Sequence, residues 1–273
     1  MNAACSVAKS LEDVIALSET SIGAVTVGSI TVEARAGNPE PRWYIGEGYA
    51  LNSFGMPNSG SNFYRHHLAS MLNIVHTAHK KLSLSVAGFN TQEYVTLARL
   101  ADDSGVDLLE INLGCPNVTT DGKPKRIASF DSDTIREIIE AVSKVTSIPL
   151  LLKLSPYSNP AELQAVAQTI ADTKKVSAIV TSNTFPNSMM FKKNTSVIGA
   201  GLAGFSGHAF LPIGLGQVQQ FRSALPSNIA VIGVGGVETK DDVTLYKLAG
   251  ASGVQAATLI VRDGHHAIER LFE

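Results

Sequence analysis

The segment DLLEINLGCPN, residues 107–117, decides the fold class. Its first half is largely apolar, as expected of a strand buried in a parallel sheet. Its second half is a polar turn that contains two amide side chains and a thiol. Parallel α/β folds bind their ligands at the carboxyl ends of such strands. The segment therefore predicts a buried strand that ends at a binding site.

Strand-like runs alternate with amphipathic helical windows along the whole chain, which is the order of repeated βα units. Seven runs have strand character: residues 23–30, 82–89, 107–115, 149–156, 178–184, 229–236 and 253–260, and residues 1–5 can supply the stub of an eighth. Helical periodicity marks residues 11–18, 92–104, 134–145, 161–173 and 241–248. Eight such units in 273 residues favour one (β/α)8 barrel, the TIM barrel, over an open doubly wound sheet.

Two long segments interrupt this alternation, residues 33–61 and residues 184–212. The first is rich in Gly, Pro and Asn, and the second contains several Phe and Met residues. Long loops after barrel strands usually bind ligands, so both segments are predicted to lie over the active site. The chain has no internal repeat, low-complexity tract or linker, and residues 1–273 are therefore predicted to form a single domain.

The composition is that of an ordinary globular protein, with a formal net charge of -2 and 44% hydrophobic residues. It has no basic surplus for binding a nucleic acid. The longest apolar run, residues 148–152, is far shorter than the roughly 20 residues of a membrane-spanning helix, and the first residues do not resemble a signal peptide. The two cysteines have neither CxxC nor metal-ligand spacing. We expect a cytoplasmic protein with reduced thiols, no metal site, and no nucleic-acid or membrane partner.

Polar side chains lie at the predicted strand ends. Asn112, Cys115 and Asn117 can hydrogen-bond a neutral planar substrate beside a thiol that exchanges a proton. The alternative is a buried cysteine between turn-capping asparagines, and the spacing alone does not decide between the two. Asn183 follows another strand, and Asn52 lies in the first long loop. Each asparagine alone is more often a turn residue, but several at one barrel mouth favour a binding site.

Lys153 is a lone cation at the end of an apolar strand. Burying its ammonium is costly unless an anionic partner is present. The alternative is an ammonium that extends to solvent or pairs with a carboxylate. Because strand ends of barrels face the active site, an electron-rich cofactor is the favoured partner.

Small residues at the last strand ends indicate a phosphate site. Gly235 and Gly236 follow one strand, where glycines let backbone N–H groups approach a phosphate. Ala257 and Thr258 fit the same use at the last strand end, and phosphate sites at this position are common in barrels. Gly207 indicates a further close approach of backbone.

These motifs together resemble those of the dihydroorotate dehydrogenases, and in particular the soluble class with a cysteine base. The resemblance extends over nearly the whole chain. It rests on residues 1–4 (MNAA), 37–42 (GNPEPR), 52–58 (NSFGMPN), 111–117 (INLGCPN) and 232–239 (IGVGGVET), with Lys153 and Asn183. It implies an FMN enzyme of pyrimidine biosynthesis that oxidises dihydroorotate to orotate. Cys115 would remove the C5 proton while the C6 hydride passes to N5 of the flavin.

The resemblance also implies which residues form the site. Those that would bind the substrate are Asn52, Met56, Asn112, Asn117, Asn183 and Thr184. Those that would hold FMN are Ala3, Ala4, Gly28, Lys153, Gly207, Gly235, Gly236, Ala257 and Thr258. Relatives of this class are commonly homodimers that use fumarate as the electron acceptor. The other option in the family is a partner subunit that passes electrons to NAD.

The chain departs from the family pattern at three positions. Gly28 stands where the family usually has a lysine near the flavin, Cys5 stands in a turn where the family has glycine, and Ala257 replaces the glycine of a Gly-Thr pair. The chain is also shorter than its relatives at both termini. Two alternatives therefore stay open: a divergent FMN barrel that acts on another small cyclic substrate, and a catalytically weakened paralogue retained for binding or assembly.

Overall fold

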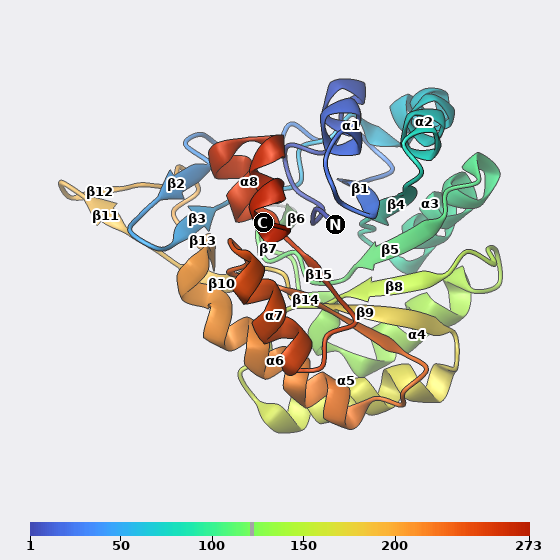
Figure 1. Cartoon of the computed structure of the whole chain (residues 1–273). Helices are drawn as coiled ribbons and strands as arrows, with labels where there is room; N and C mark the ends of the chain where they lie inside the picture. Colours follow the sequence, from blue (N-terminus) through green and yellow to red (C-terminus); the bar gives the residue numbers. More distant parts are fainter. Residues whose placement is uncertain (121–122) are drawn as a thin grey trace.

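A computed structural model describes residues 1–120 and 123–273 (Figure 1). Its centre is a curled sheet of seven strands, all parallel and adjacent in chain order. The strands are β1 (Ala24–Ile30), β4 (Lys81–Val86), β5 (Leu108–Asn112), β8 (Leu150–Lys153), β9 (Val176–Thr181), β14 (Ala230–Val234) and β15 (Gly253–Gln255). The predicted barrel class is therefore confirmed.

Helices cover the outside of this sheet (Figure 1). They are α1 (Leu11–Ser18), α2 (Gly60–Thr77), α3 (Thr91–Ser104), α4 (Ser132–Val142), α5 (Pro160–Thr173), α6 (Leu211–Ala224), α7 (Lys240–Leu248) and α8 (Thr258–Asp263). The five predicted helical windows are confirmed within a few residues. The strand predicted over residues 253–260 was too long, because the chain leaves the sheet after Gln255 and turns into α8. Within the described ranges, no helix is long and apolar enough to cross a membrane.

The first three residues occupy the eighth position of the barrel. Asn2 forms a parallel bridge with Ala256, and the N–H of Ala3 donates to the Ala256 carbonyl at 2.8 Å. Towards β1, the Asn2 side chain makes the hydrogen bonds that a neighbouring strand would make. Its Nδ2 donates to the Thr26 carbonyl at 2.7 Å, and its Oδ1 accepts from the Thr26 N–H at 2.8 Å. The predicted stub of an eighth strand thus joins β15 to β1.

Replacing Asn2 with alanine is expected to lower the free energy of unfolding by about 3 kcal/mol, because it leaves a buried donor and a buried acceptor of Thr26 without partners. Asn2 is fully buried, so water cannot replace the lost bonds. Urea denaturation measures the change. Asn73→Ala, on an exposed position of α2, is the matched control and should change stability by less than about 0.5 kcal/mol. Equal effects of the two substitutions would contradict the closing role of Asn2.

The two long segments expected to be loops pair with each other over the barrel mouth. They contribute β2 (Trp43–Ile45), β3 (Ala50–Asn52), β10 (Phe185–Ser188) and β13 (Ala203–Ser206), which form an antiparallel sheet in the order β10-β13-β3-β2. A hairpin of β11 (Phe191–Lys192) and β12 (Thr195–Ser196) projects beyond this sheet (Figure 1). The remaining elements are β6 (Thr119–Thr120), β7 (Lys123–Pro124) and three 3-10 helices, η1 (Ala128–Phe130), η2 (His208–Phe210) and η3 (His265–Leu271).

Candidate active site

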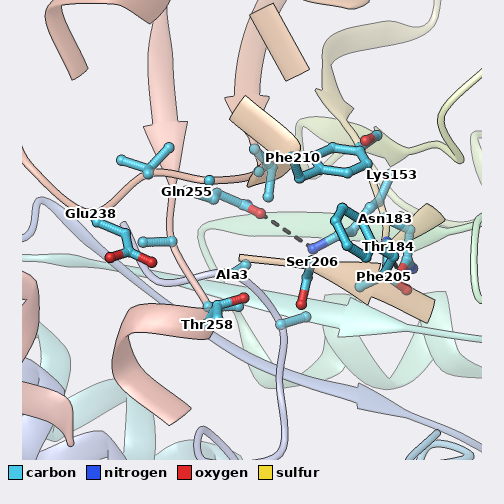
Figure 2. Close-up of a pocket in the computed structure, with 18 residues that line it drawn as sticks. Ala3, Lys153, Asn183, Thr184, Phe205, Ser206, Phe210, Glu238, Gln255 and Thr258 are labelled. Atoms are coloured by element: carbon cyan, nitrogen blue, oxygen red, sulfur yellow. Dashed lines mark hydrogen bonds between the residues drawn. The ribbon is translucent and has the colours of Figure 1, made fainter. Parts of the chain in front are cut away.

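Two adjoining cavities lie at the carboxyl ends of the barrel strands. The first, about 570 Å³, is called the glycine cavity here (Figure 2). Of the predicted site residues, it is lined by Ala3, Ala4, Lys153, Asn183, Thr184, Gly235, Gly236, Ala257 and Thr258. The second, about 490 Å³, is the thiol cavity. It is lined by Ala4, Gly28, Asn52, Met56, Asn112, Cys115, Asn117 and Asn183. Ala4 and Asn183 line both, so the two cavities share a wall.

Gly207 is the one predicted site residue that lines neither of the two cavities. Its backbone has a φ of +89°, and a Cβ there would lie 2.7 Å from the Cα of Tyr49. The close backbone approach predicted at this position is therefore present, but the backbone of Gly207 approaches that of Tyr49 and not a cofactor. Gly207 brings the chain against β3 and leads into Phe210, whose ring lines the glycine cavity.

The asparagines of the thiol cavity hold one another in place. Nδ2 of Asn117 donates to the backbone carbonyl of Asn52 at 2.8 Å, and Nδ2 of Asn183 lies 3.4 Å from Oδ1 of Asn112. Oδ1 of Asn112 also accepts from the N–H of Gly114 at 3.1 Å. These contacts fix which amide atoms donate and which accept. The cavity therefore offers a preorganised set of neutral hydrogen-bonding groups.

The thiol of Cys115 lies among these amides. Burial raises the pKa of Cys115, while the N–H of Asn117 and the cations of Lys125, Arg35 and Lys9 offset part of that effect. The thiol is therefore protonated over most of the neutral range. It becomes a base as the pH approaches its raised pKa.

A buried carboxylate connects the two cavities through the barrel interior. Glu110 is fully buried on β5, where its Oε2 accepts from Nε2 of Gln255 at 3.0 Å. Oε1 of Gln255 in turn lies 3.4 Å from Nζ of Lys153 (Figure 2). The Lys153 ammonium is thus held through a neutral amide by a carboxylate, and it faces the glycine cavity.

The same carboxylate orients the thiol cavity from its other oxygen. Oγ of Ser85 donates to Oε1 of Glu110 at 2.8 Å, and Oγ of Ser29 lies 2.8 Å from Oγ of Ser85. Nδ2 of Asn112 then donates to Oγ of Ser29 at 2.8 Å. Sequence reasoning missed Glu110, Gln255 and Ser29. An acid between the apolar residues Leu109 and Ile111 of the predicted strand was the available signal, since buried carboxylates need partners.

The glycine cavity has polar groups without a partner in the described part of the protein and a sharp glycine turn. The hydroxyls of Ser182 and Thr184 are buried and have no hydrogen-bond partner among the described residues, although both residues line the cavity. Gly235 and Gly236 have φ values of +120° and +71°. A Cβ at Gly235 would lie 2.3 Å from the Phe210 ring, so only glycine permits this turn. The cavity therefore combines unpartnered hydroxyls, a cation and two glycines in its wall.

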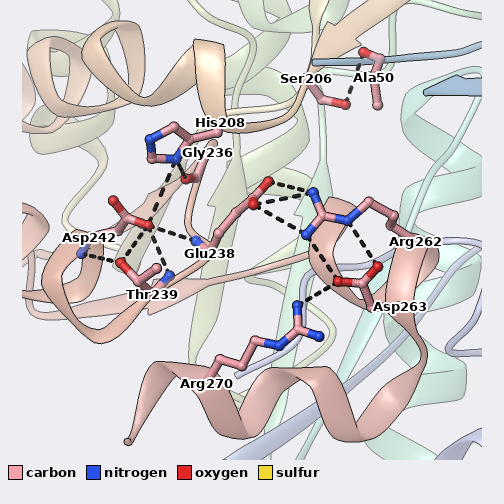
Figure 3. A network of polar contacts seen from close by, with 10 residues as sticks. All are labelled: Ala50, Ser206, His208, Gly236, Glu238, Thr239, Asp242, Arg262, Asp263 and Arg270. Carbon is pink, nitrogen blue, oxygen red and sulfur yellow. Dashed lines mark hydrogen bonds and ion pairs between the residues drawn. The ribbon is translucent and has the colours of Figure 1, made fainter. Parts of the chain in front are cut away.

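One carboxylate also lines the glycine cavity, but a guanidinium neutralises it. Arg262 on α8 contacts both oxygens of Glu238 at 3.0 to 3.2 Å (Figure 3). Arg262 also pairs with Asp263, which raises the pKa of the guanidinium above its usual range. Because Glu238 is engaged in this forked pair, an anionic group can approach the neighbouring Gly235 and Gly236.

Comparison with known proteins identifies the family. The family model described as dihydroorotate dehydrogenase matches residues 1–273. The fumarate-type dihydroorotate dehydrogenase of Trypanosoma cruzi is 33% identical over 280 residues, covering 99% of this chain and 86% of the relative. The chain belongs to the dihydroorotate dehydrogenase family. The catalytic subunit of the NAD(+)-type enzyme of Listeria welshimeri is 32% identical over 244 residues, covering 89% of this chain and 77% of the relative.

A solved structure supports the fold. The dihydroorotate dehydrogenase of Eimeria tenella, crystallised with ferulenol, superposes with a TM-score of 0.81 at 20% identity and covers 99% of this chain and 78% of that one. The identity is low, so this likeness concerns the barrel alone. The chain has relatives in both the fumarate and the NAD(+) types at nearly equal identity.

The residues of the glycine cavity fit FMN, the flavin of this family. The hydroxyls of Ser182 and Thr184 lack partners that a polar ligand supplies, and the Lys153 ammonium suits an electron-rich ring. Gly235 and Gly236 lie where backbone N–H groups can approach a phosphate. Ala257, in place of the family glycine, lines the cavity without closing it.

Gly28 and Cys5 change the thiol cavity relative to the family pattern. Gly28 has a φ of +111°, and a Cβ there would lie 2.3 Å from the Ser85 carbonyl oxygen. This backbone therefore has no room for the lysine that relatives usually have. Cys5 lines the same cavity as Cys115, and burial raises the pKa of its thiol too. The cavity thus contains two thiols and lacks the usual strand lysine.

Proposed function

We propose that this protein oxidises dihydroorotate to orotate and uses FMN as its redox cofactor. The observation that supports the proposal is the shared wall between a cavity of four asparagines around Cys115 and a cavity of flavin-compatible groups beside Lys153. A substrate between them can be deprotonated from one side and oxidised from the other. Bound FMN would supply a hydride acceptor at its N5.

In this proposal Cys115 is the base. Its sulfur removes the proton from C5 of dihydroorotate as the hydride leaves C6, so two hydrogens and two electrons leave the ring together. Asn52, Asn112, Asn117 and Asn183 hydrogen-bond the ring N–H and carbonyl groups, and Met56 and Thr184 complete the substrate walls. The cation of Lys153 stabilises negative charge that develops beside it. Glu110 holds both Lys153 and Asn112 in place through Gln255, Ser85 and Ser29.

The visible absorption spectrum tests this proposal. Purified protein is expected to bind FMN and to show flavin bands that bleach under anaerobic conditions when dihydroorotate is added. Dihydrouracil, which lacks the carboxylate, is the control and should bleach them far more slowly. Bands that persist with dihydroorotate would favour a divergent barrel with another small cyclic substrate, for which Gly28 and Cys5 are the specific grounds. A protein that stays colourless with added FMN would favour the weakened paralogue.

Fumarate as acceptor, a cytoplasmic location and a homodimer belong to the same proposal. The dimer has a candidate surface beside the β11–β12 hairpin, where Met189, Met190, Phe191 and Leu202 are exposed, Phe191 by 59%. Exposed apolar groups of this kind are typical of association sites.

Light scattering tests the dimer. The wild-type protein is expected at twice the 28.8 kDa chain mass, and Phe191→Glu is expected to weaken association at least tenfold by burying a charge in the interface. Leu248→Glu on α7, where Leu248 is 80% exposed, is the matched control and should leave the mass unchanged. A monomeric wild-type protein, or equal behaviour of the two variants, would count against this surface.

A further inference from the structure

A lysine enters the thiol cavity from the segment that precedes α1. Lys9 lines this cavity together with Cys5, Asn52 and Cys115. The neighbouring Ala8 carbonyl accepts a hydrogen bond from the N–H of Gly28 at 3.1 Å, which fixes the segment against β1. The ammonium of Lys9 donates to the carbonyl of Pro57, in the loop that follows β3. A cation is thus held at the cavity wall by two elements distant in sequence.

No carboxylate neutralises this cation within the described ranges, because no acidic oxygen lies within 4 Å of its Nζ. The nearest candidate, Asp13, is used otherwise: its Oδ2 accepts from the backbone N–H of Lys9 at 3.0 Å, and its Oδ1 pairs with His265 at 3.1 Å. The other charged neighbours of the cavity thiol are Arg35 and Lys125, which are also cations. The thiol cavity is therefore lined by a positively charged side chain and, among the residues that the structure describes, by no carboxylate.

Burial lowers the pKa of Lys9, and the nearby Cys5, Cys115 and Asp13 counteract this effect. A half-buried ammonium bound to one carbonyl retains unused donors. The described side chains that line the cavity around it include neutral amides and thiols but no carboxylate, and Asp13 acts on it from outside the cavity. The group that would complete this environment is an anion of the ligand.

We propose that Lys9 binds the anionic group of the substrate, which under the proposed function is the carboxylate of dihydroorotate. The identity of the anion rests on the proposed function. Its negative charge is inferred from the cation that lines the cavity. Position 28, on the adjacent strand, has no space for a side chain, so the cation comes from the segment before α1 instead. Lys9 is then a residue that determines specificity for an acid over its neutral analogues.

A purely structural role is the competing explanation, because Lys9 also connects the Pro57 loop to the segment that precedes α1. Lys9→Gln distinguishes the structural role from the anion-binding role, since glutamine retains a donor for the Pro57 carbonyl and removes the charge. Lys9→Arg retains the charge. Lys80→Gln is the matched control, because the half-buried Lys80 also donates to backbone carbonyls, those of Thr20 at 2.6 Å and Ile22 at 3.0 Å, at the other end of β1.

The experiment titrates the FMN-bound protein with orotate and with its neutral carboxamide, and follows the flavin absorption. Lys9→Gln is expected to raise the Kd for orotate about 10- to 100-fold, as for loss of a hydrogen bond to a charged group. The Kd for the carboxamide should change by less than threefold, and Lys9→Arg and Lys80→Gln should change neither by more than that. An unchanged orotate Kd in Lys9→Gln, or an equal loss for both ligands, would overturn the inference while the proposed function stands.

A second readout needs no substrate. Iodoacetate and iodoacetamide alkylate the same thiol, but only iodoacetate is an anion, and peptide mass spectrometry resolves Cys115 from Cys5. The rate ratio of iodoacetate to iodoacetamide at Cys115 is expected to fall at least threefold in Lys9→Gln and to stay constant in Lys80→Gln. If the wild-type protein binds no orotate, the proposed function fails. The ratio then decides the anion site alone: a fall supports it and a constant ratio overturns it.

Discussion

Cys115→Ser is expected to lower the rate of dihydroorotate oxidation about 100- to 10,000-fold at neutral pH, the range for loss of a positioned general base. A serine hydroxyl is far less acidic than a thiol, so almost none of it is ionised at this pH and available to accept the C5 proton. Anaerobic stopped-flow measurement of flavin bleaching gives the rate directly. The asparagines of the cavity remain, so orotate should still bind the variant with a similar Kd.

Cys5→Ser is the control for this prediction, because Cys5 lines the same cavity and is the other possible base. We expect it to leave the rate within about threefold of the wild-type value. If Cys5→Ser removed activity and Cys115→Ser did not, the base would be assigned to the wrong thiol. Similar small effects of both would mean that neither thiol removes the proton.

The pH dependence follows from the direction of the Cys115 pKa shift. Burial raises this pKa, and the active form of the base is the thiolate. The thiolate fraction therefore rises with pH, and the rate of the wild-type protein should increase from pH 7 towards pH 9. In Cys115→Ser the same rise should begin at higher pH, since the hydroxyl ionises later. A wild-type rate that falls over this interval would contradict a thiol base.

The barrel and much of its mouth could be predicted because both depend on local patterns. Apolar strands alternate with amphipathic helices, and parallel strands necessarily bring their carboxyl ends together. Asn112 ends such a strand, Cys115 and Asn183 follow such strands, and all three line the same cavity. Asn52 also lines it, although it lies in β3 of the second sheet, which escaped prediction because its strands have only three or four residues.

The remaining parts of the site depend on contacts that no local pattern encodes. Glu110 meets Gln255 across 145 residues, and Lys9 meets Pro57 across 48. Asn2 replaces a strand through its side chain, which a search for apolar periodicity cannot detect. α6 was missed since Gly214 and Gly216 lower its helix propensity, yet Gly214 packs directly beneath the hydroxyl of Tyr246. Tertiary packing decides these positions.

Gly28→Lys, which restores the usual family residue, is expected to destabilise the protein by about 2 to 6 kcal/mol. The φ of +111° costs a non-glycine residue about 1 to 3 kcal/mol. The Cβ, 2.3 Å from the Ser85 carbonyl oxygen, adds about 1 to 3 kcal/mol of overpacking. For a chain of this size, such a loss lowers Tm by roughly 10 °C.

Gly23→Lys is the matched control for this substitution, because Gly23 precedes the same strand and a Cβ at that position would have no heavy atom within 4 Å. It should change Tm by no more than about 2 °C. Thermal unfolding of the two variants therefore distinguishes the effect of adding a lysine from the effect of the position at which it is added. If Gly28→Lys melted with the wild-type protein, β1 would be able to move away from Ser85. Glycine would then not be structurally required at position 28, and Lys9 and a lysine on β1 could both act in the cavity.

A large loss of stability would instead mean that the backbone conformation at position 28 requires glycine. The positive charge of the thiol cavity then has to come from an element other than β1.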